Sequence, residues 1–448
     1  MKIVVKELMT SLDAFDIYSL YKDEKDIIFL DSSLKNEYGR YSILGLNPFA
    51  VLKGRHRQCE LNGKAFDGDV FDELSRLLRA YHIEHDTDLP IAGGCLGYFS
   101  YDLGLDLEEI KTTSQEDVVL PHFYFVFYDN LIVFDHAQSR TFVTACGRLR
   151  DAHDSIGAIE TAVSAASPVV YHDRQQAPAP FISSLTKPAY LAAIRRMIDY
   201  ILAGDIYIAN LTQRLYCETT RETYDIYRDL RKANPAPFAA LMRLDGFDVI
   251  SSSPERFLKI RDNCVETRPI KGTRPRGATP AEDEKNKAAL AASEKDKAEL
   301  LMIVDLERND LSKVCQAHSV AVTELYKIEA YSTVFHLVST ITGRLKDGVD
   351  AVHGMQACFP GGSITGTPKI RAMEIIDELE GLKRALYTGC IGYFSFDGNA
   401  DFNIVIRTIL KKGSDAYLGV GGGITCDSDP EAEYQECLDK AKALLNVL

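Results

Sequence analysis

The chain has 448 residues, 46% of them hydrophobic and 26% charged, a composition typical of a globular protein with a large core. Its net charge of −14 and pI near 5.3 argue against a nucleic-acid or membrane partner, because no basic stripe is available to meet phosphates. No run of residues reaches the ~20 apolar positions that span a bilayer, and the first residues lack a secretory signal. The ten scattered cysteines form no CxxC pair and predict a reduced, cytoplasmic protein.

Taken in order, the chain divides into two regions. Residues 1–166 are expected to be rich in short strands, with helices near 70–82 and 154–165. A proline-containing stretch at 167–180 has no periodicity and is typical of a linker. The second region, 181–448, is expected to open with a helix whose first turn contains Thr186, Lys187 and Pro188.

Two later stretches also predict helices. Residues 281–310 consist largely of strong helix formers, with charges spaced for i,i+4 pairs in the first half and apolar residues in the second. Asp429 and Pro430 mark the start of a last helix, on which Glu433 and Glu436 would share one face, opposite much of the lysine-bearing face. Charges on such helices are usually solvated, so these carboxylates need further evidence before they are given a role.

An internal echo indicates the architecture. GCLGYFSYD at 94–102 and GCIGYFSFD at 389–397 agree at seven of nine positions, and a weaker echo pairs ILGLNPF at 43–49 with SSSPERF at 251–257. We therefore predict an α+β fold with a large two-sheet β-sandwich core, helices on the outside, and two related, intertwined halves.

The stretch 251–273 carries the first candidate for chemistry. Strands expected at 248–252 and 264–267 flank a polar turn at 261–263 and predict a hairpin, with Glu255 just past one strand and Lys271 just past the other. A lysine in an apolar setting has a lowered pKa and is a nucleophile near neutral pH, whereas a solvated surface lysine is the alternative interpretation.

Several motifs in this order resemble the chorismate-utilising enzymes. They are SPERF at 253–257, TRPIKGTRPRG at 267–277, LMIVDLERNDL at 301–311, FPGGSITGTPKIRAMEIIDELE at 359–380 and GYFSFDGNADFNIVIRT at 392–408. The resemblance implies chorismate as substrate and the same two-half fold. Within this family, PIAGT is typical of anthranilate synthase large subunits, and PIKGT, with Lys271, is the mark of aminodeoxychorismate synthase component I.

The resemblance also implies a magnesium cofactor and a set of site residues. Glu299 and Glu436 match carboxylates that hold magnesium in the family, and Glu433 is a third candidate ligand; Mg²⁺ prefers such oxygen ligands. The expected catalytic residues are Lys271, Glu255 and His336. The expected substrate contacts are Gly272, Thr273, Tyr387, Arg407, Gly421, Gly422, Gly423 and Lys369.

The residues alone leave alternatives open for several of these positions. The run Gly421 to Gly423 is compatible with an anion-binding nest of backbone N–H groups or with a strand bulge. Arg407 is expected within a strand, where its guanidinium suits bidentate carboxylate binding. Lys369 would add positive charge at the start of a helix, and His336 alone would be an ordinary buried strand histidine.

The implied reaction is amination of chorismate at C4. Lys271 would attack C2 while Glu255 protonates the departing hydroxyl, and ammonia would then add at C4 and expel the lysine. A glutamine amidotransferase subunit is the expected partner, because the chain shows no cysteine nucleophile elbow of its own.

Three other functions remain as alternatives. Anthranilate synthase is the nearest one. Isochorismate formation is less favoured, because the segment 205–214 lacks the lysine that activates water in such relatives, and Ile208 stands where amine-adding relatives often carry glutamine. A non-catalytic sensor is the most distant, since related N-terminal regions hold free tryptophan; the matching residues are Ser32, Tyr38, Gly39, Arg40, Tyr41, Pro237, Phe238 and Ala239.

Overall fold

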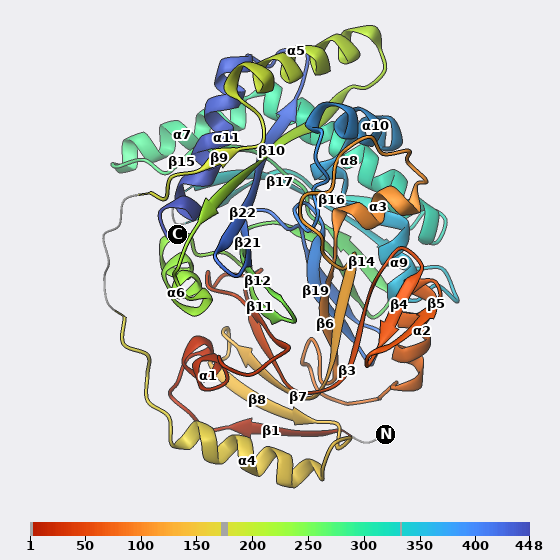
Figure 1. Cartoon of the computed structure of the whole chain (residues 1–448), viewed down its shortest axis with the longest axis vertical. Helices are drawn as coiled ribbons and strands as arrows, with labels where there is room; N and C mark the ends of the chain where they lie inside the picture. Colours follow the sequence, from red (N-terminus) through yellow and green to blue (C-terminus); the bar gives the residue numbers. More distant parts are fainter. Residues whose placement is uncertain (1–2, 172–177, 332–333) are drawn as a thin grey trace.

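The computed structural model describes residues 3–171, 178–331 and 334–448, so part of the predicted linker, 172–177, lies outside the described residues. Within the described chain, every strand pairs antiparallel, and all the strands belong to one hydrogen-bonded network (Figure 1). The strands of the first region are β1 (Val4–Leu8), β2 (Ile27–Asp31), β3 (Tyr41–Arg55), β4 (Gln58–Leu61), β5 (Lys64–Asp67), β6 (Gly94–Phe99), β7 (Phe123–Asp135) and β8 (Arg140–Ala145).

The second region supplies the remaining strands. They are β9 (Ile182–Ser183), β10 (Ile208–Glu218), β11 (Phe238–Leu244), β12 (Phe247–Ser253), β13 (Arg256–Arg261), β14 (Cys264–Thr267), β15 (Ile270–Pro275), β16 (Ala321–Ala330), β17 (Val334–Arg344), β18 (Gly366–Thr367), β19 (Cys390–Ser395), β20 (Ala400–Asn403), β21 (Thr408–Lys412) and β22 (Asp415–Ile424).

The helices pack outside these strands. They are α1 (Ala14–Leu20), α2 (Val70–Ala80), α3 (Tyr101–Leu107), α4 (Ala152–Ser164), α5 (Lys187–Ala203), α6 (Thr223–Ala233), α7 (Pro280–Ala292), α8 (Glu294–Val314), α9 (Ala351–Cys358), α10 (Lys369–Glu380) and α11 (Pro430–Leu445), with a short 3₁₀ turn at Gly362–Ile364. The predicted helix starts are confirmed at Thr186 and Asp429, whose side chains accept hydrogen bonds from the first turns of α5 and α11.

The sheet forks at β7. One edge of β7 pairs with β3 along its length, while the other pairs with β6 in its first half and β8 in its second. From β6 one arm continues through β19, β20, β13, β14 and β17; from β3 the other continues through β2, β11, β12, β21, β22 and β10. The regions predicted at 1–166 and 181–448 therefore contribute strands to the same sheet, through the β2–β11 and β6–β19 pairs.

Three clusters of buried apolar residues show how the two arms of the sheet and the helices are layered. The cluster between the arms contains strand and loop residues such as Tyr98, Val126 and Val249, with no residue from a helix. A second cluster packs α2, α8 and α9 against one arm, and a third packs α1, α4, α5, α6, α10 and α11 against the other. The prediction of a two-layer sandwich with outer helices is confirmed, because burial of both faces of each arm needs a cover on each side.

The internal echo is a structural repeat. Its two copies form β6 and β19, which pair antiparallel with each other, and the equivalent glycines Gly97 and Gly392 lie directly opposite. The neighbouring strands follow the same pattern in both halves. In the first half β3 pairs with β7; in the second half β12 pairs with β21 and β13 pairs with β20. The two halves thus meet about an approximate twofold axis at β6 and β19.

The halves differ where long strands are interrupted. The single strand β3, which has a bulge between Pro48 and Ala50, corresponds to β12 plus β13, separated at Pro254 and Glu255, and β7 corresponds to β20 plus β21, separated at 404–407. The two breaks face each other, since the Ile404 amide donates to the Glu255 carbonyl at 3.0 Å. In a strand, successive side chains point to opposite faces of the sheet. At these two breaks the side chains need not follow that rule, so they can point in other directions.

Two local predictions were wrong in detail. The turn at Asp262 and Asn263 has φ angles of 52° and 61°, and it joins β13 to β14 rather than joining the strand at 248–252 to 264–267. Pro254 lacks an N–H and follows the end of β12, so a separate strand intervenes. The predicted helix 281–310 is two helices, because Ser293 ends α7 and caps α8.

Candidate active site

Lys271 is held inside β15, not beyond a strand as predicted. Its neighbour Gly272 has φ of +69°, and the register with β17 shifts between Lys271 and Thr273, so Gly272 forms a β-bulge. A Cβ added at Gly272 would lie 2.9 Å from Cβ of Asp296 on α8. The glycine therefore does two things: it redirects the lysine and lets α8 approach the strand.

The half-buried side chain of Lys271 and the buried carboxyl of Glu255 both lie beside Ser363. Nζ of Lys271 donates a hydrogen bond to the Ser363 carbonyl at 3.0 Å. Desolvation lowers the pKa of Lys271, against the opposing effect of Glu255 and Glu299. Burial raises the pKa of Glu255, against the opposing effect of the Ser363 side chain and Lys271. Both shifts run in the direction that suits a nucleophilic amine paired with an acid.

Helices α8 and α11 bring the predicted metal ligands together. Lys295 lies 3.8 Å from a carboxylate oxygen of Glu299 and 3.7 Å from one of Glu433, and both glutamate side chains are almost buried, at 12% and 10% exposed. Glu436 forms an ion pair with Lys440 at 2.8 Å. Burial raises the pKa of Glu299, whereas in Glu436 the effect of burial is outweighed by Lys440 and the pKa is lowered.

The three predicted ligands are not placed alike. Glu299 and Glu433 are nearly buried and share Lys295, whereas Glu436 is 60% exposed and pairs with Lys440. Among the described residues these carboxylates are not gathered within 4.8 Å of one another. Their chemistry suits magnesium, because all the donor atoms are oxygens, which Mg²⁺ prefers over nitrogen and sulfur; Glu299, Glu433 and Glu436 are the residues that would hold the ion.

The glycine run lines the same space from β22. A Cβ at Gly423 would lie 3.6 Å from Nζ of Lys271, and one at Gly422 would lie 3.4 Å from both Glu433 and Lys440. The run is a regular strand paired with β10, so it forms neither the nest nor the bulge that the sequence left open. Its function in the geometry is to leave room between the lysine and α11.

A second group of residues surrounds His336, the strand partner of Thr273. Nδ1 of His336, on β17, lies 2.9 Å from the Thr273 hydroxyl. Burial, assisted by Arg407, lowers the pKa of His336 to about 4, so the ring is neutral at neutral pH. Arg407 occupies the break between β20 and β21 with φ of +53°, not a strand as predicted. Burial lowers the pKa of Arg407, against the opposing effect of Tyr387 and Glu436.

Lys369 is the predicted substrate contact that the structure places elsewhere. Its ammonium group is buried and donates to Asp310 at 2.5 Å and to the carbonyls of Cys358 and Pro360 at 3.1 and 2.8 Å. An ammonium has three protons, and these three acceptors use them all. Lys369 therefore ties α10 to α8 and has no proton left for a ligand.

The sequence did not single out four residues that shape the site. Ser363 contacts Lys271, and Lys440 donates to the Gly421 carbonyl at 2.8 Å as well as to Glu436, so α11 presents a lysine on the same face as its carboxylates. The Glu436 to Lys440 spacing of four residues was the available signal. Gly419 has the Tyr387 ring directly against it, and Glu307 is buried beneath Thr267. Neither of these two contacts could be predicted from the neighbouring residues in the sequence.

A separate cavity of about 220 Å³ lies between the two regions. Of the predicted tryptophan-pocket residues, all but Gly39 line it: Ser32, Tyr38, Arg40, Tyr41, Pro237, Phe238 and Ala239. Gly39 instead permits a tight loop, because a Cβ there would lie 2.1 Å from the Leu34 carbonyl. The Arg268 guanidinium covers the Tyr38 ring at 3.8 Å, which connects the cavity to the segment that leads into β15.

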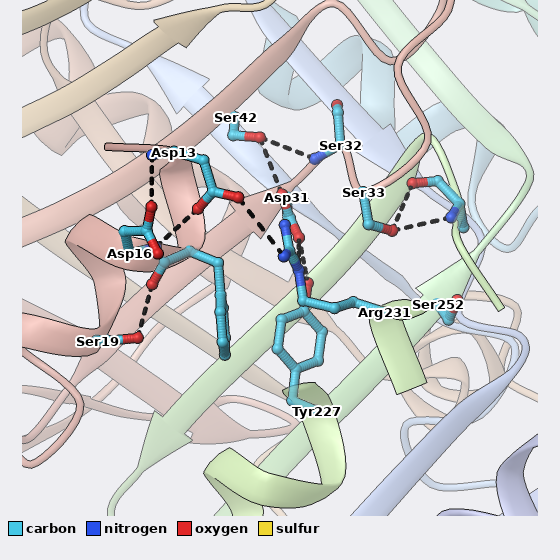
Figure 2. A network of polar contacts seen from close by, with 12 residues as sticks. Asp13, Asp16, Ser19, Asp31, Ser32, Ser33, Ser42, Tyr227, Arg231 and Ser252 are labelled. Atoms are coloured by element: carbon cyan, nitrogen blue, oxygen red, sulfur yellow. Dashed lines mark hydrogen bonds and ion pairs between the residues drawn. The ribbon is translucent and has the colours of Figure 1, made fainter. Parts of the chain in front are cut away.

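Polar contacts fix one wall of this cavity (Figure 2). Asp31 accepts hydrogen bonds from Tyr227 at 2.9 Å, Arg231 at 3.2 Å and Ser42 at 3.0 Å. The Ser32 hydroxyl reaches the carbonyls of Tyr41 and Pro237 at 2.7 and 2.9 Å. A buried carboxylate with three donors is well satisfied, so the wall is a preformed surface.

Comparison with known proteins places this arrangement among relatives. The profile of a family described as chorismate binding enzyme matches residues 27–446. The chain is 36% identical over 456 residues to anthranilate synthase component 1 of Acetivibrio thermocellus (96% of this chain, 92% of the relative), and 38% identical over 443 residues to aminodeoxychorismate synthase component 1 of Bacillus subtilis (96% and 93%).

A solved structure agrees with the fold. The crystal structure of anthranilate synthase component I from Streptococcus pneumoniae TIGR4 superimposes with a TM-score of 0.83 at 32% identity, covering 92% of this chain and 93% of that one. Among the described residues, the helices are all too short or too polar to cross a membrane.

Proposed function

The chain belongs to the chorismate-binding enzyme family, and from this premise we propose that it is the large subunit of an aminodeoxychorismate synthase, which aminates chorismate at C4. Relatives of both specificities are similar to it, so overall identity does not choose between amination at C4 and anthranilate formation. The choice between these two reactions rests on the residue that we propose to face C2 of the substrate ring.

Lys271 is the observation that carries the proposal. Its side chain is half-buried, desolvation lowers the pKa of its amine, and the amine lies close to Gly423 and Glu255. An amine with a lowered pKa is better suited to attack on carbon than the amine of a solvated surface lysine. Alanine at this position would leave C2 open to ammonia.

The proposed reaction uses two steps. The Lys271 amine attacks C2 of the ring, both ring double bonds shift, and the C4–O bond breaks as Glu255 gives its proton to the departing hydroxyl, so that water leaves. Ammonia then forms a bond to C4, the double bonds shift back, and the C2–N bond breaks, which returns the free Lys271 amine; the new C4 ammonium gives one proton back to the Glu255 carboxylate. Glu255 is suited to the acid role because burial raises its pKa.

The surrounding residues would bind and orient the substrate anion. Arg407 offers a planar guanidinium for one carboxylate, and neutral His336, held by Thr273, offers a ring face or a nitrogen without adding charge. When bound at Glu299, Glu433 and Glu436, magnesium would neutralise the ring carboxylate of chorismate. Ile208, whose Cδ1 would lie 3.4 Å from a Cβ at Gly423, keeps the C2 side apolar and without a base for water.

Ammonia is proposed to come from glutamine through a partner amidotransferase subunit. The free cysteines of the described chain are buried except two: Cys264 begins β14, and Cys426 lies in the turn between β22 and α11. The purified chain should therefore use ammonium salts and not glutamine. Tryptophan is the proposed occupant of the 220 Å³ cavity, either as a regulator or as a structural ligand.

Trapping tests the covalent step. Chorismate and magnesium without ammonia should yield an intact mass increased by chorismate less one water, localised by peptide mapping to Lys271. The Lys271→Ala protein should lose this species and shift amination toward C2, while Lys287→Ala, which removes a half-exposed lysine of α7, should behave as the wild type. Exclusive C4 amination by the alanine variant would refute the covalent role, and pyruvate with anthranilate from the wild type would identify an anthranilate synthase.

A further inference from the structure

A cluster of metal-ligating side chains lies outside the site described above. It consists of His56, Asp106 and His122, whose potential ligand atoms all lie within 4.8 Å of one another. His56 belongs to the turn between β3 and β4, Asp106 to α3, and His122 to the segment that immediately precedes β7. We propose that these three residues form a binding site for a zinc-class divalent transition metal.

The carboxylate of Asp106 stands between the two rings. One of its oxygens lies 2.7 Å from Nδ1 of His56, and the other lies 2.9 Å from Nδ1 of His122. The rings are close to each other as well, with centroids 4.7 Å apart and planes at 60°. The carboxylate thus bridges the two rings, and two imidazole nitrogens with a carboxylate oxygen are a donor set that zinc uses, with one or more waters completing the sphere.

Local charge favours a cation. Arg55 and Arg57, which flank His56, are each paired with a carboxylate, those of Glu116 and Asp67. Asp106, by contrast, has no Lys or Arg partner among the described residues and contacts only the two histidines. Asp106, 26% exposed, is therefore an oxygen ligand with two imidazoles beside it and no competing cation.

His122 is fixed in the core, whereas His56 is not. The His122 side chain is only 2% exposed, and its Nδ1 makes the contact with Asp106. The other ring nitrogen, Nε2, is buried without a hydrogen-bond partner in the described chain and takes no part in the cluster. His56, in contrast, has a side chain that is 55% exposed, and it can move the short distance needed to bring its nitrogen to a metal bond of about 2.0–2.1 Å.

A metal ion at this cluster would stabilise both ends of the long segment that connects α3 to β7. α3 is followed by the segment 108–121, in which the Thr113 hydroxyl donates to Asp377 at 3.0 Å and the Gln115 amide donates to the Gly381 carbonyl at 2.9 Å. Both acceptors lie at the end of α10, near the turn that carries Tyr387. The proposed role is therefore structural: the ion would join the two ends of this segment, at Asp106 and His122, to the β3–β4 turn.

Metal binding by the full chain tests the proposal. Chelator-treated protein would be titrated with Zn²⁺ by calorimetry and with Co²⁺ by visible absorption, with excess Mg²⁺ present to occupy the oxygen-only site. The exposed Cys264 and Cys426 would be changed to Ser in every protein, to exclude thiolate binding. One equivalent of Zn²⁺ should bind, and Co²⁺ should give a ligand-field spectrum without a sulfur charge-transfer band.

The variants are His56→Ala and Asp106→Asn, because His56 is exposed and the asparagine is isosteric, so both should fold. Each should weaken zinc binding by at least about tenfold and abolish the zinc-induced rise in melting temperature. The matched control is His353→Ala, which removes a histidine that also lies beside a carboxylate, 2.7 Å from Asp350, and should bind zinc like the parent. Retention of zinc by either variant, or no binding by the parent, overturns the proposal and leaves a hydrogen-bonded His-Asp-His contact.

Discussion

Replacement of Glu307 by glutamine is expected to remove a large part of the pH dependence of stability. Glu307 is fully buried on α8, and burial raises its pKa from 4.5 to about 8. The Thr267 hydroxyl lies 2.9 Å from Glu307 and 2.7 Å from the Phe257 carbonyl, and it has one proton. If that proton goes to the carbonyl, a protonated Glu307 donates to the hydroxyl and every group is satisfied.

The direction of the pH dependence follows from the linkage between proton binding and folding. The folded-state pKa is raised, so the unfolded chain releases the proton from about pH 4.5 upward while the folded chain keeps it until about pH 8. The associated stability is fully present below about pH 4.5 and is lost as the pH rises to about 8. Each pKa unit corresponds to about 1.4 kcal/mol, so the loss reaches about 5 kcal/mol above pH 8 and about 3 kcal/mol near pH 7.

The Glu307→Gln protein cannot ionise at this position, and its amide can donate to Thr267 as the protonated acid does. Urea unfolding near pH 5, 7 and 9, followed by circular dichroism, should show a stability difference in favour of the variant that grows over this range by a few kcal/mol. The control is Glu294→Gln on the same helix, at a side chain that is 87% exposed, which should parallel the wild type. Parallel profiles for wild type and Glu307→Gln would refute the assigned ionisation.

Three further outcomes are expected. Glu255→Gln should lower the amination rate by about 10²–10⁴-fold, and wild-type kcat should fall as the pH rises through the raised pKa of Glu255, because only the protonated form donates; a pH-independent kcat would exclude this acid. Glu436→Gln should move the magnesium activation curve to higher concentration, and an unchanged curve would remove Glu436 from the ligand set. Tyr38→Ala should weaken tryptophan binding by calorimetry with active-site residues untouched; equal affinity would place the ligand outside the 220 Å³ cavity.

Local signals in the sequence were enough to predict several elements. The caps Thr186 and Asp429 and the repeated GYFS segments act over a few residues, so helix starts and the paired β6 and β19 could be found without a structure. Lys369 shows the limit of this approach. Its sequence neighbours do not distinguish a ligand-binding lysine from one enclosed by Asp310 and two carbonyls, because those acceptors come from other segments.

The same limit applies to the site itself. Lys271 was identified from its motif, but its placement depends on the bulge at Gly272 and on the approach of Asp296, which is 24 residues away in the chain. The contact of Lys440 with the Gly421 carbonyl could not be predicted either, because a helix pattern does not show which neighbour a side chain meets. The positions of such side chains depend on packing between segments far apart in the chain, which local sequence propensity does not reveal.

The repeat gives a physical reason why only one half carries the proposed catalytic residues. In the first half β7 is buried along its whole length, and β3 continues as one strand through a bulge between Pro48 and Ala50. In the second half Pro254 and the left-handed Arg407 interrupt the corresponding strands, and a broken strand need not alternate its side chains between two packed faces. Glu255 and Arg407 are thereby released from the core pattern at two facing breaks. A sandwich that is stable through one intact half can accept such interruptions in the other, because the pairs β12–β21 and β13–β20 on either side of the breaks remain formed.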